Sequence, residues 1–350
     1  MGLTELLKKA VSLGGSDVFI IPGSDVMAKV EDEMVPMTGE RLSPADTEAL
    51  VRGMYELARR DFDILEHEGD DDFSFAIREV SRFRCNAYHQ RGTVAATCRV
   101  VTFDLPDPAK LGIPDVVMEL AKLRSGMVLV TGPAGSGKST TLACVVDRIN
   151  STRHAHIVTI EDPIEYIHNH KQSLVSQREV PNDAATFSRA LRAALRQAPD
   201  VVMLGEMRDR DTITTAITAA ETGHLLLSSL HTIGAAKTID RIVDSFPAEQ
   251  QAQIRIQLSA VLKAVVSQRL VPTVDGKREA VFEVMTVTPA IQTMIRDGRT
   301  HQIDNAIYGG SDRNMISMDS ELARLVKQGR ITRETALLYA GNADVLAKRI

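Results

Sequence analysis

The chain has 350 residues and a mass of 38.3 kDa, which is enough to bury a sizeable core and predicts two domains. Its 44% hydrophobic and 25% charged residues are ordinary for a globular protein, and the net charge of -5 argues against a mainly nucleic-acid-binding surface. The three cysteines are odd in number and lack metal-ligand spacing, so neither a disulfide framework nor a zinc site is expected. This cysteine usage predicts a reducing, cytoplasmic compartment.

No apolar run approaches the roughly 20 residues that a membrane span requires. The N-terminal stretch 1–13 carries Glu5, Lys8 and Lys9 among its apolar residues, which predicts an amphipathic helix rather than a signal peptide. Any membrane association is therefore expected to be peripheral and to depend on a partner protein.

The first part of the chain, residues 1–101, predicts a mixed α/β domain. Ser43 followed by Pro44 predicts the N-cap and the first turn of a helix over 43–57. Strands are expected at apolar runs bounded by turn residues: 18–21, 27–30, 73–80 and 82–101, the last with a hairpin break at Gly92.

A proline-rich segment, 102–114, predicts a linker, because Pro106, Pro108 and Pro114 remove backbone donors and fix φ. Beyond it apolar strands alternate with helices, which predicts a parallel sheet covered on both faces. The expected strands are 127–130, 157–160, 201–204 and 225–230. The expected helices are 139–149, 183–197 and 211–222, followed by a mostly helical region with 290–297, 319–328 and 332–339.

The strongest chemical signal is Gly132-Pro133-Ala134-Gly135-Ser136-Gly137-Lys138-Ser139, which matches G-x-x-x-x-G-K-[ST] between an expected strand and an expected helix. The glycines allow successive backbone N–H groups to curl around phosphate oxygens at a helix N-terminus. Lys138 is expected to reach the β- and γ-phosphates, and the Ser139 hydroxyl to bind Mg²⁺. The expected nucleotide contacts are Gly132, Ala134, Gly135, Ser136, Gly137, Lys138, Ser139 and Thr140.

Three further strands end in polar residues: Glu161, Glu206 and His231 follow or close the runs 157–160, 201–204 and 225–230. In parallel sheets ligands bind beyond the carboxyl ends of the strands. A carboxylate there can hold Mg²⁺ or align the attacking water, and a histidine can contact the γ-phosphate. Each alone is more often an ordinary exposed strand end, but three beside a phosphate loop favour ATP hydrolysis.

These segments resemble four motifs of the secretion and type IV pilus ATPases, in the order of that family: Walker A at Gly132–Ser139, the Asp box at Thr159–Glu165, Walker B at Gly205–Asp209 and the His box at Gly223–Thr232. The similarity is nearly continuous over 126–270 and weaker elsewhere. The resemblance implies a PAS-like mixed α/β N-terminal domain and a RecA-like P-loop NTPase domain, here 115–350 with its helical C-terminal region. It also implies ATP and Mg²⁺ as ligands and a homo-hexameric ring.

The resemblance also implies roles for particular residues. Glu161 and Glu206 divide water activation and Mg²⁺ positioning, with Ser139 and Glu206 as metal ligands; which glutamate does which stays open. His231 contacts the γ-phosphate. Arg84 and Arg99 of the N-terminal domain approach the γ-phosphate as arginine fingers, although from their spacing alone they are exposed strand residues.

Two other patterns favour structural roles. Arg189, Arg192 and Arg196 recur at helical spacing, which favours a solvated or intersubunit face over a nucleic-acid contact. His168 and His170 have metal-ligand spacing but no third ligand nearby, so a surface loop is favoured over a metal site.

The resemblance also bears on whether the motor assembles or retracts pili. Assembly ATPases of the family carry a four-cysteine zinc insert and a larger N-terminal region, and this chain has neither. The segment 290–296 matches the Ala-Ile-Arg-Asn-Leu-Ile-Arg-like stretch of retraction ATPases at its ends but departs from it at Gln292, Thr293 and Met294, and Phe19 replaces a histidine common in the family.

We therefore expect a retraction motor like those of the PilT family, which acts on an inner-membrane platform protein resembling PilC and drives pilus disassembly and twitching motility. Pilus assembly or type II secretion is one alternative. A nucleotide-binding accessory subunit with little turnover is the other.

Overall fold

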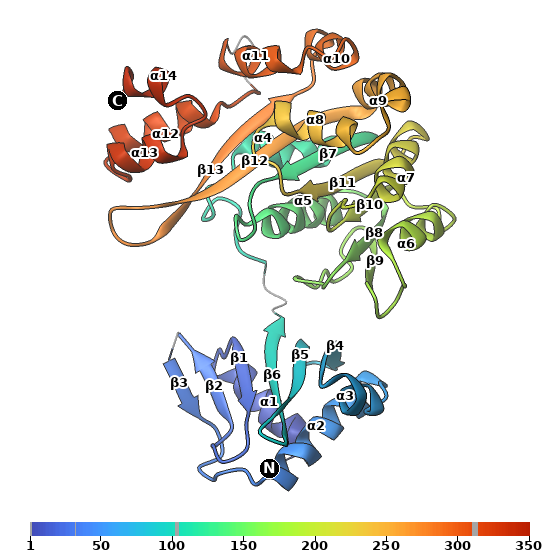
Figure 1. Cartoon of the computed structure of the whole chain (residues 1–350), viewed down its shortest axis with the longest axis vertical. Coiled ribbons are helices and arrows are strands. Elements are labelled where there is room, and N and C mark those ends of the chain that lie inside the picture. The colour runs from blue at the N-terminus through green and yellow to red at the C-terminus, as the bar shows by residue number, and fades with distance from the viewer. Residues whose placement is uncertain (1, 32, 102–104, 310–313) are drawn as a thin grey trace. The chain divides into compact units, whose positions relative to one another are not determined.

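The computed structural model describes residues 2–31, 33–101, 105–309 and 314–350, which form two compact units. Unit 1 is Met1–Asp104 and unit 2 is Leu105–Ile350, and each has a sheet of its own (Figure 1). Of the segment predicted as a linker, residues 102–104 lie outside the described residues. Leu105, Leu111 and Ile113 pack in a core of unit 2.

Unit 1 is a six-stranded antiparallel sheet in the order β3-β2-β1-β6-β5-β4. The strands are β1 Asp17–Ile20, β2 Met27–Val30, β3 Glu33–Pro36, β4 Asp70–Ile77, β5 Ser81–Gln90 and β6 Thr93–Val101. The helices are α1 Leu3–Ser12, α2 Pro44–Ala58 and α3 Asp63–Glu68. Strands β4 and β5 alternate between buried and exposed residues, as expected when one face of an antiparallel sheet packs on the core.

Local sequence signals account for much of unit 1. Ser43 is the N-cap of α2, as predicted, and the structure adds a capping box with Asp46. Gly92 adopts a φ of 74° in the predicted hairpin between β5 and β6. Strand β4 begins three residues earlier than predicted, at Asp70, because the chain turns at Gly69, where φ is 84°.

Unit 2 is a seven-stranded sheet in the order β13-β12-β7-β11-β10-β8-β9. The strands are β7 Gly126–Thr131, β8 His156–Glu161, β9 Leu174–Glu179, β10 Val201–Leu204, β11 Leu225–Leu230, β12 Leu262–Pro272 and β13 Arg278–Thr286. Neighbouring strands are parallel except for the β12–β13 hairpin.

The helices of unit 2 cover both faces of this sheet. They are α4 Asp115–Glu119, α5 Lys138–Thr152, α6 Phe187–Ala194, α7 Arg210–Glu221, α8 Ala235–Asp244, α9 Ala248–Val261, α10 Pro289–Arg296, α11 Ile303–Gly309, α12 Met318–Lys327, α13 Arg333–Tyr339 and α14 Ala343–Ala347, with 3-10 turns at Leu120–Lys122 and Thr300–Gln302. Met127 and Leu129 of β7 belong to the core formed with α6 to α9, and Val128 and Val130 to the core formed with α4 and α5. A strand covered on both faces is apolar throughout, and β7 follows that rule.

Several elements of unit 2 differ from the prediction. Strand β9 and the β12–β13 hairpin were not predicted, and the two helices α8 and α9 before that hairpin were not predicted either. The helix expected over 183–197 is shorter, because Thr186 accepts a hydrogen bond from Arg189 N and caps α6 there. All three cysteines are free and buried. In the part of the chain that the structure describes, no helix is long and apolar enough to cross a membrane.

Candidate active site

The phosphate loop follows β7 and leads directly into α5, as predicted. Gly132, Gly135 and Gly137 have φ values of 145°, 73° and 89°, a region that residues with side chains rarely adopt. A Cβ on Gly132 would also lie 2.1 Å from Gln268 O. Glycine is therefore required here by the backbone, and the loop places N–H groups at the start of a helix.

Lys138, the first residue of α5, folds back on this loop. Its Nζ donates hydrogen bonds of 3.0 Å to Gly132 O and of 3.0 Å to Pro133 O. Burial lowers the pKa of Lys138, and the Glu206 carboxylate partly offsets that effect. A buried ammonium group beside a glycine loop is suited to bind an anion.

Glu161 ends β8 and is buried. Its Oε1 accepts a hydrogen bond of 2.6 Å from Thr159 Oγ1 and one of 3.3 Å from Gln177 Nε2. Burial raises the pKa of Glu161 to about 7, although these hydrogen bonds act in the opposite direction. The carboxyl group is therefore held in place and titrates near neutral pH.

Glu206 lies just after β10 and is also buried. His231 Nε2 lies 3.1 Å from Glu206 Oε2, and Arg208 Nη2 lies 2.5 Å from Oε1. This ion pair raises the pKa of Arg208. The two strand tips that the sequence placed at one edge of the sheet are thus in direct contact.

A cavity of about 230 Å³ brings the predicted residues of unit 2 together. It lies over the carboxyl ends of β8, β10 and β11, because these strands are parallel neighbours in the sheet. Its lining includes Ala134, Gly135, Lys138, Ser139, Glu161, Glu206, Arg208 and His231. The predicted hydroxyl, carboxylate, imidazole and ammonium groups of Ser139, Glu161, Glu206, His231 and Lys138 therefore line the same cavity.

A second cavity, of about 570 Å³, borders the other side of the loop. Its lining includes Gly137, Thr140 and Thr141 on the side of the loop and α5, and residues 109–113 and the β12–β13 hairpin form its other walls. Thr140 lines this second cavity rather than the first, and its Oγ1 lies 3.0 Å from the hydroxyl of Tyr166. Gly132 and Ser136 line neither cavity.

The two arginines predicted as fingers belong to unit 1. Arg84 on β5 is the register partner of Arg99 on β6, so the two residues are direct cross-strand neighbours. Arg99 Nε donates a hydrogen bond of 2.9 Å to Asp17 Oδ1 on β1, and its side chain is 67% exposed. Among the described residues, the Arg84 side chain has no hydrogen-bond or ion-pair partner.

Sequence reasoning missed the residues that hold these groups in place. Gln177 donates both to Glu161 and to Tyr166 O, and Gln268 accepts from Thr141 Oγ1 at 2.7 Å. Gln177 lies in a segment similar to the family, but a polar residue in a strand gives no sign of its partner. Gln268 lies on β12, a strand that was not predicted.

The two patterns that favoured structural roles lie apart from the cavities. Arg189 and Arg192 are exposed on α6, while Arg196 lies beyond the end of that helix. The surface-loop prediction is wrong for His168, which is buried with Nδ1 3.9 Å from Asp147 Oδ1; His170 is exposed. No group of three or more metal-ligating side chains occurs in the described parts of the chain.

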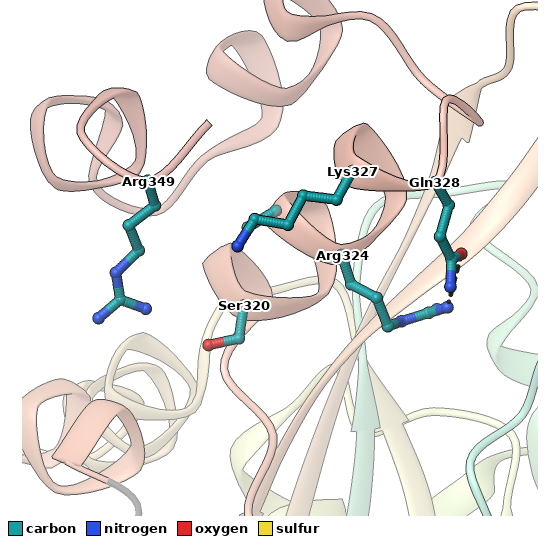
Figure 2. A pocket seen from close by; sticks show the side chains of 6 residues that line it. Ser320, Arg324, Lys327, Gln328 and Arg349 are labelled. Atoms are coloured by element: carbon teal, nitrogen blue, oxygen red, sulfur yellow. Dashed lines mark hydrogen bonds between the residues drawn. The ribbon is translucent and has the colours of Figure 1, made fainter.

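A larger hollow, of about 700 Å³, lies on α12 and near the end of the chain. Figure 2 shows its lining residues Ser320, Arg324, Lys327, Gln328 and Arg349, and Arg324 Nη1 donates a hydrogen bond of 3.0 Å to Gln328 Oε1. It contains none of the predicted site residues and its side chains are mostly exposed. Volume alone therefore does not mark the active site.

Comparisons with known proteins show the family of the chain. The sequence model of the type II/IV secretion system protein family matches residues 114–347. The type IV pilus retraction ATPase PilT of Pseudomonas aeruginosa is 44% identical over 337 residues, which are 96% of this chain and 97% of that protein. The type IV pilus ATPase PilU of the same organism is 41% identical over 348 residues, which are 99% of this chain and 90% of that protein.

A solved structure agrees as well. The crystal structure of the pilus retraction motor PilT with bound ADP aligns with a TM-score of 0.90 at 44% identity and covers 99% of both chains. The predicted fold, an N-terminal mixed α/β domain followed by a RecA-like ATPase domain, is confirmed. The chain belongs to the type II/IV secretion system protein family.

Proposed function

We propose that this chain is an ATPase motor that hydrolyses ATP to ADP and phosphate and thereby drives type IV pilus retraction. The observation that carries the proposal is the single cavity in which Lys138, Glu161, Glu206 and His231 meet beside the phosphate loop. Similarity to PilT and to PilU along nearly the whole chain supports it.

The nucleotide would bind across the two cavities. Its phosphates lie along the loop, where backbone N–H groups and the α5 N-terminus favour negative charge. Lys138 exchanges its hydrogen bonds to loop carbonyls for bonds to the β- and γ-phosphates. The base and sugar occupy the cavity beyond Gly137 and Thr140.

The donor groups in the smaller cavity fit Mg²⁺. Ser139 and Glu206 both line it and offer a hydroxyl and a carboxylate oxygen. Mg²⁺ prefers oxygen ligands and keeps several waters, so one or two protein ligands are enough. When bound, Mg²⁺ neutralises the charge that develops between the β- and γ-phosphates.

Glu161 and Glu206 divide the remaining chemistry, and His231 connects it to the γ-phosphate. One glutamate positions the metal and the other orients and deprotonates the attacking water. A carboxyl with a pKa of about 7, as in Glu161, is in the range that suits a general base at neutral pH. His231, which is hydrogen-bonded to Glu206, senses whether the γ-phosphate is present.

Movement would come from an assembly of copies. In a homo-hexameric ring, Arg84 and Arg99 of the N-terminal domain approach the γ-phosphate and stabilise its developing charge. Opening and closing of the N-terminal domain against the ATPase domain would turn hydrolysis into displacement, because a γ-phosphate that is bound before hydrolysis and lost after it can bias a hinge. The ring works in the cytoplasm, at the inner face of the membrane, on a platform protein resembling PilC, and the cellular outcome is twitching motility.

The alternatives are an assembly or type II secretion motor and an accessory subunit with little turnover. The close identities to PilT and to PilU, 44% and 41%, leave the choice of pilus role to experiment.

Two experiments test the proposal. Purified protein should release phosphate from ATP in steady state only when Mg²⁺ is present, measured over a range of protein concentrations so that oligomers can form. An absence of Mg²⁺-dependent release at every concentration contradicts the motor. A deletion strain should then keep or gain surface pili and lose twitching, whereas loss of the pili themselves indicates an assembly role.

A further inference from the structure

Gln268 occupies a special place beside the phosphate loop. β12 is a parallel neighbour of β7, and Ser267 is the register partner of Thr131, the last residue of β7. Gln268 is therefore level with Gly132, where the loop begins. Its residue exposure is 4%, and a polar side chain buried to this extent normally has a hydrogen-bonding task.

Gln268 contacts the loop at both ends. Its backbone carbonyl excludes any side chain at Gly132, since a Cβ there would lie 2.1 Å from Gln268 O. Its amide lies against the other end, since a Cβ on Gly137 would be 2.9 Å from Gln268 Nε2. One residue thus contacts the first and the last glycine of the loop.

The side chain of Gln268 is held by α5. Thr141 Oγ1 donates a buried hydrogen bond of 2.7 Å to Gln268 Oε1. This bond fixes the amide plane of Gln268 and directs Nε2 toward Gly137 and the wall of the cavity of about 570 Å³. The contact therefore ties β12, the loop and the first turns of α5 together.

We propose that Gln268, through Thr141, is a positioning residue that sets the shape of the phosphate loop and so its affinity for nucleotide. The inference rests on the proposed nucleotide binding by this loop. A loop already held in its bound shape loses less conformational entropy on binding. Because the same loop contacts serve ATP and the transition state, the main effect of losing this support is on KM and Kd rather than on kcat.

The test measures the Kd of a fluorescent ADP analogue by titration, together with KM and kcat for ATP. Gln268→Leu is expected to weaken binding about tenfold and to change kcat by less than about twofold, since the buried hydrogen bond from Thr141 is lost and no amide remains beside Gly137. Thr141→Val is expected to weaken binding about fivefold, whereas Thr141→Ser, which keeps the hydroxyl, should bind within about twofold of the unaltered protein.

A double variant shows whether the two residues act together. If Gln268 and Thr141 work through one hydrogen bond, Gln268→Leu with Thr141→Val should bind no more weakly than Gln268→Leu alone. Unchanged Kd in Gln268→Leu, even with a lower melting temperature, overturns the inference, as does equal weakening by Thr141→Ser and Thr141→Val. Failure of the unaltered protein to bind the analogue overturns the proposed function as well and is thereby distinguished.

Discussion

The strands of the two units are buried differently, and this difference determines in which unit a functional residue can be recognised from the sequence. In unit 2 all six residues of β7 and of β11 and all four residues of β10 are buried. The polar residues Glu161, Glu206 and His231 come only at the strand ends. In unit 1, β4 and β5 alternate between buried and exposed positions, since one face packs on the core. A polar residue at the end of a buried strand in unit 2 therefore indicates a functional site. A polar residue on a strand of unit 1 indicates only that its side chain lies on the exposed face of the sheet.

Arg84 and Arg99 show the limit of this rule. Like charges directly opposite each other on adjacent strands are destabilising, and these two arginines are register partners. Asp17 pairs with Arg99. Packing within unit 1 therefore does not explain why Arg84 is an arginine. A role for Arg84 outside unit 1 would explain it.

The largest expected effect comes from unit 2 and concerns Lys138. Lys138→Ala removes the buried cation of the loop, and nucleotide affinity should fall on the order of a thousandfold, because a phosphate would be left without its charged partner. Titration with the fluorescent ADP analogue measures it. Lys122→Ala, at an exposed lysine paired with Glu119, is the matched control and should bind normally. Retained binding in Lys138→Ala would remove the loop from the nucleotide site.

Glu206→Gln should separate binding from chemistry. The amide keeps the size of the side chain but has no negative charge for the metal or the water, so kcat should fall about 10² to 10³-fold while ADP affinity changes little. Single-turnover and steady-state phosphate release measure the loss. Glu249→Gln, at an exposed residue in the first turn of α9, serves as control. Equal rates in Glu206→Gln and unaltered protein would show that another group acts on the water.

The next prediction concerns unit 1, where Arg99→Ala removes one of the two predicted arginine fingers. We expect kcat to fall about tenfold to a hundredfold with nucleotide affinity largely intact, since Arg84 remains as a second cation. The control is Arg52→Ala, which removes an exposed arginine of the same unit that pairs with Glu48 and Glu66. If Arg99→Ala hydrolyses ATP at the normal rate, the pair of arginines serves only unit 1.

The sequence predicted the fold where local patterns and tertiary structure agree. Short-range rules account for the β7-loop-α5 segment, for the tips of β8, β10 and β11, and for the N-cap at Ser43. The β12–β13 hairpin was missed, although Asp275-Gly276 between its strands is a short-range turn signal. Its place beside β7 could not be predicted, because β12 and β7 are more than a hundred residues apart in the chain and no local pattern records that pairing. Strand β9 was missed for the same reason, since its polar residues are placed by pairing with β8.

The residues of the candidate site likewise include some that local patterns predicted and some that they did not. Lys138, Glu161, Glu206 and His231 were predicted because each follows a strand or lies in a motif, and the sheet brings such positions to one edge. The residues that orient them, Gln177 and Gln268, could not be predicted, because a hydrogen bond across strands depends on register. The contact between Glu206 and His231 likewise became visible only in the structure.

The remaining expected effect concerns the stability of unit 2 against pH. Burial raises the pKa of Glu161 from its ordinary 4.5 to about 7, so the folded protein favours the protonated carboxyl. As the pH rises through this window the unfolded chain loses its proton first, and the free energy of unfolding falls, by up to about 3 kcal/mol. Glu161→Gln should match the unaltered protein near pH 4.5 and become the more stable of the two toward pH 7.5.

Urea unfolding between pH 4.5 and 8, without nucleotide or Mg²⁺, measures this difference in unit 2. Glu283 in β13 should behave in the same way, since burial also raises its pKa to about 7, and Glu283→Gln should flatten the same part of the curve. The exposed carboxylate of Glu249 provides the control, because Glu249→Gln should keep the pH slope of the unaltered protein. An identical slope in Glu161→Gln would mean that the folded protein accommodates the ionised carboxylate at little cost. The strand tip would then already be organised to hold a charge before any metal binds.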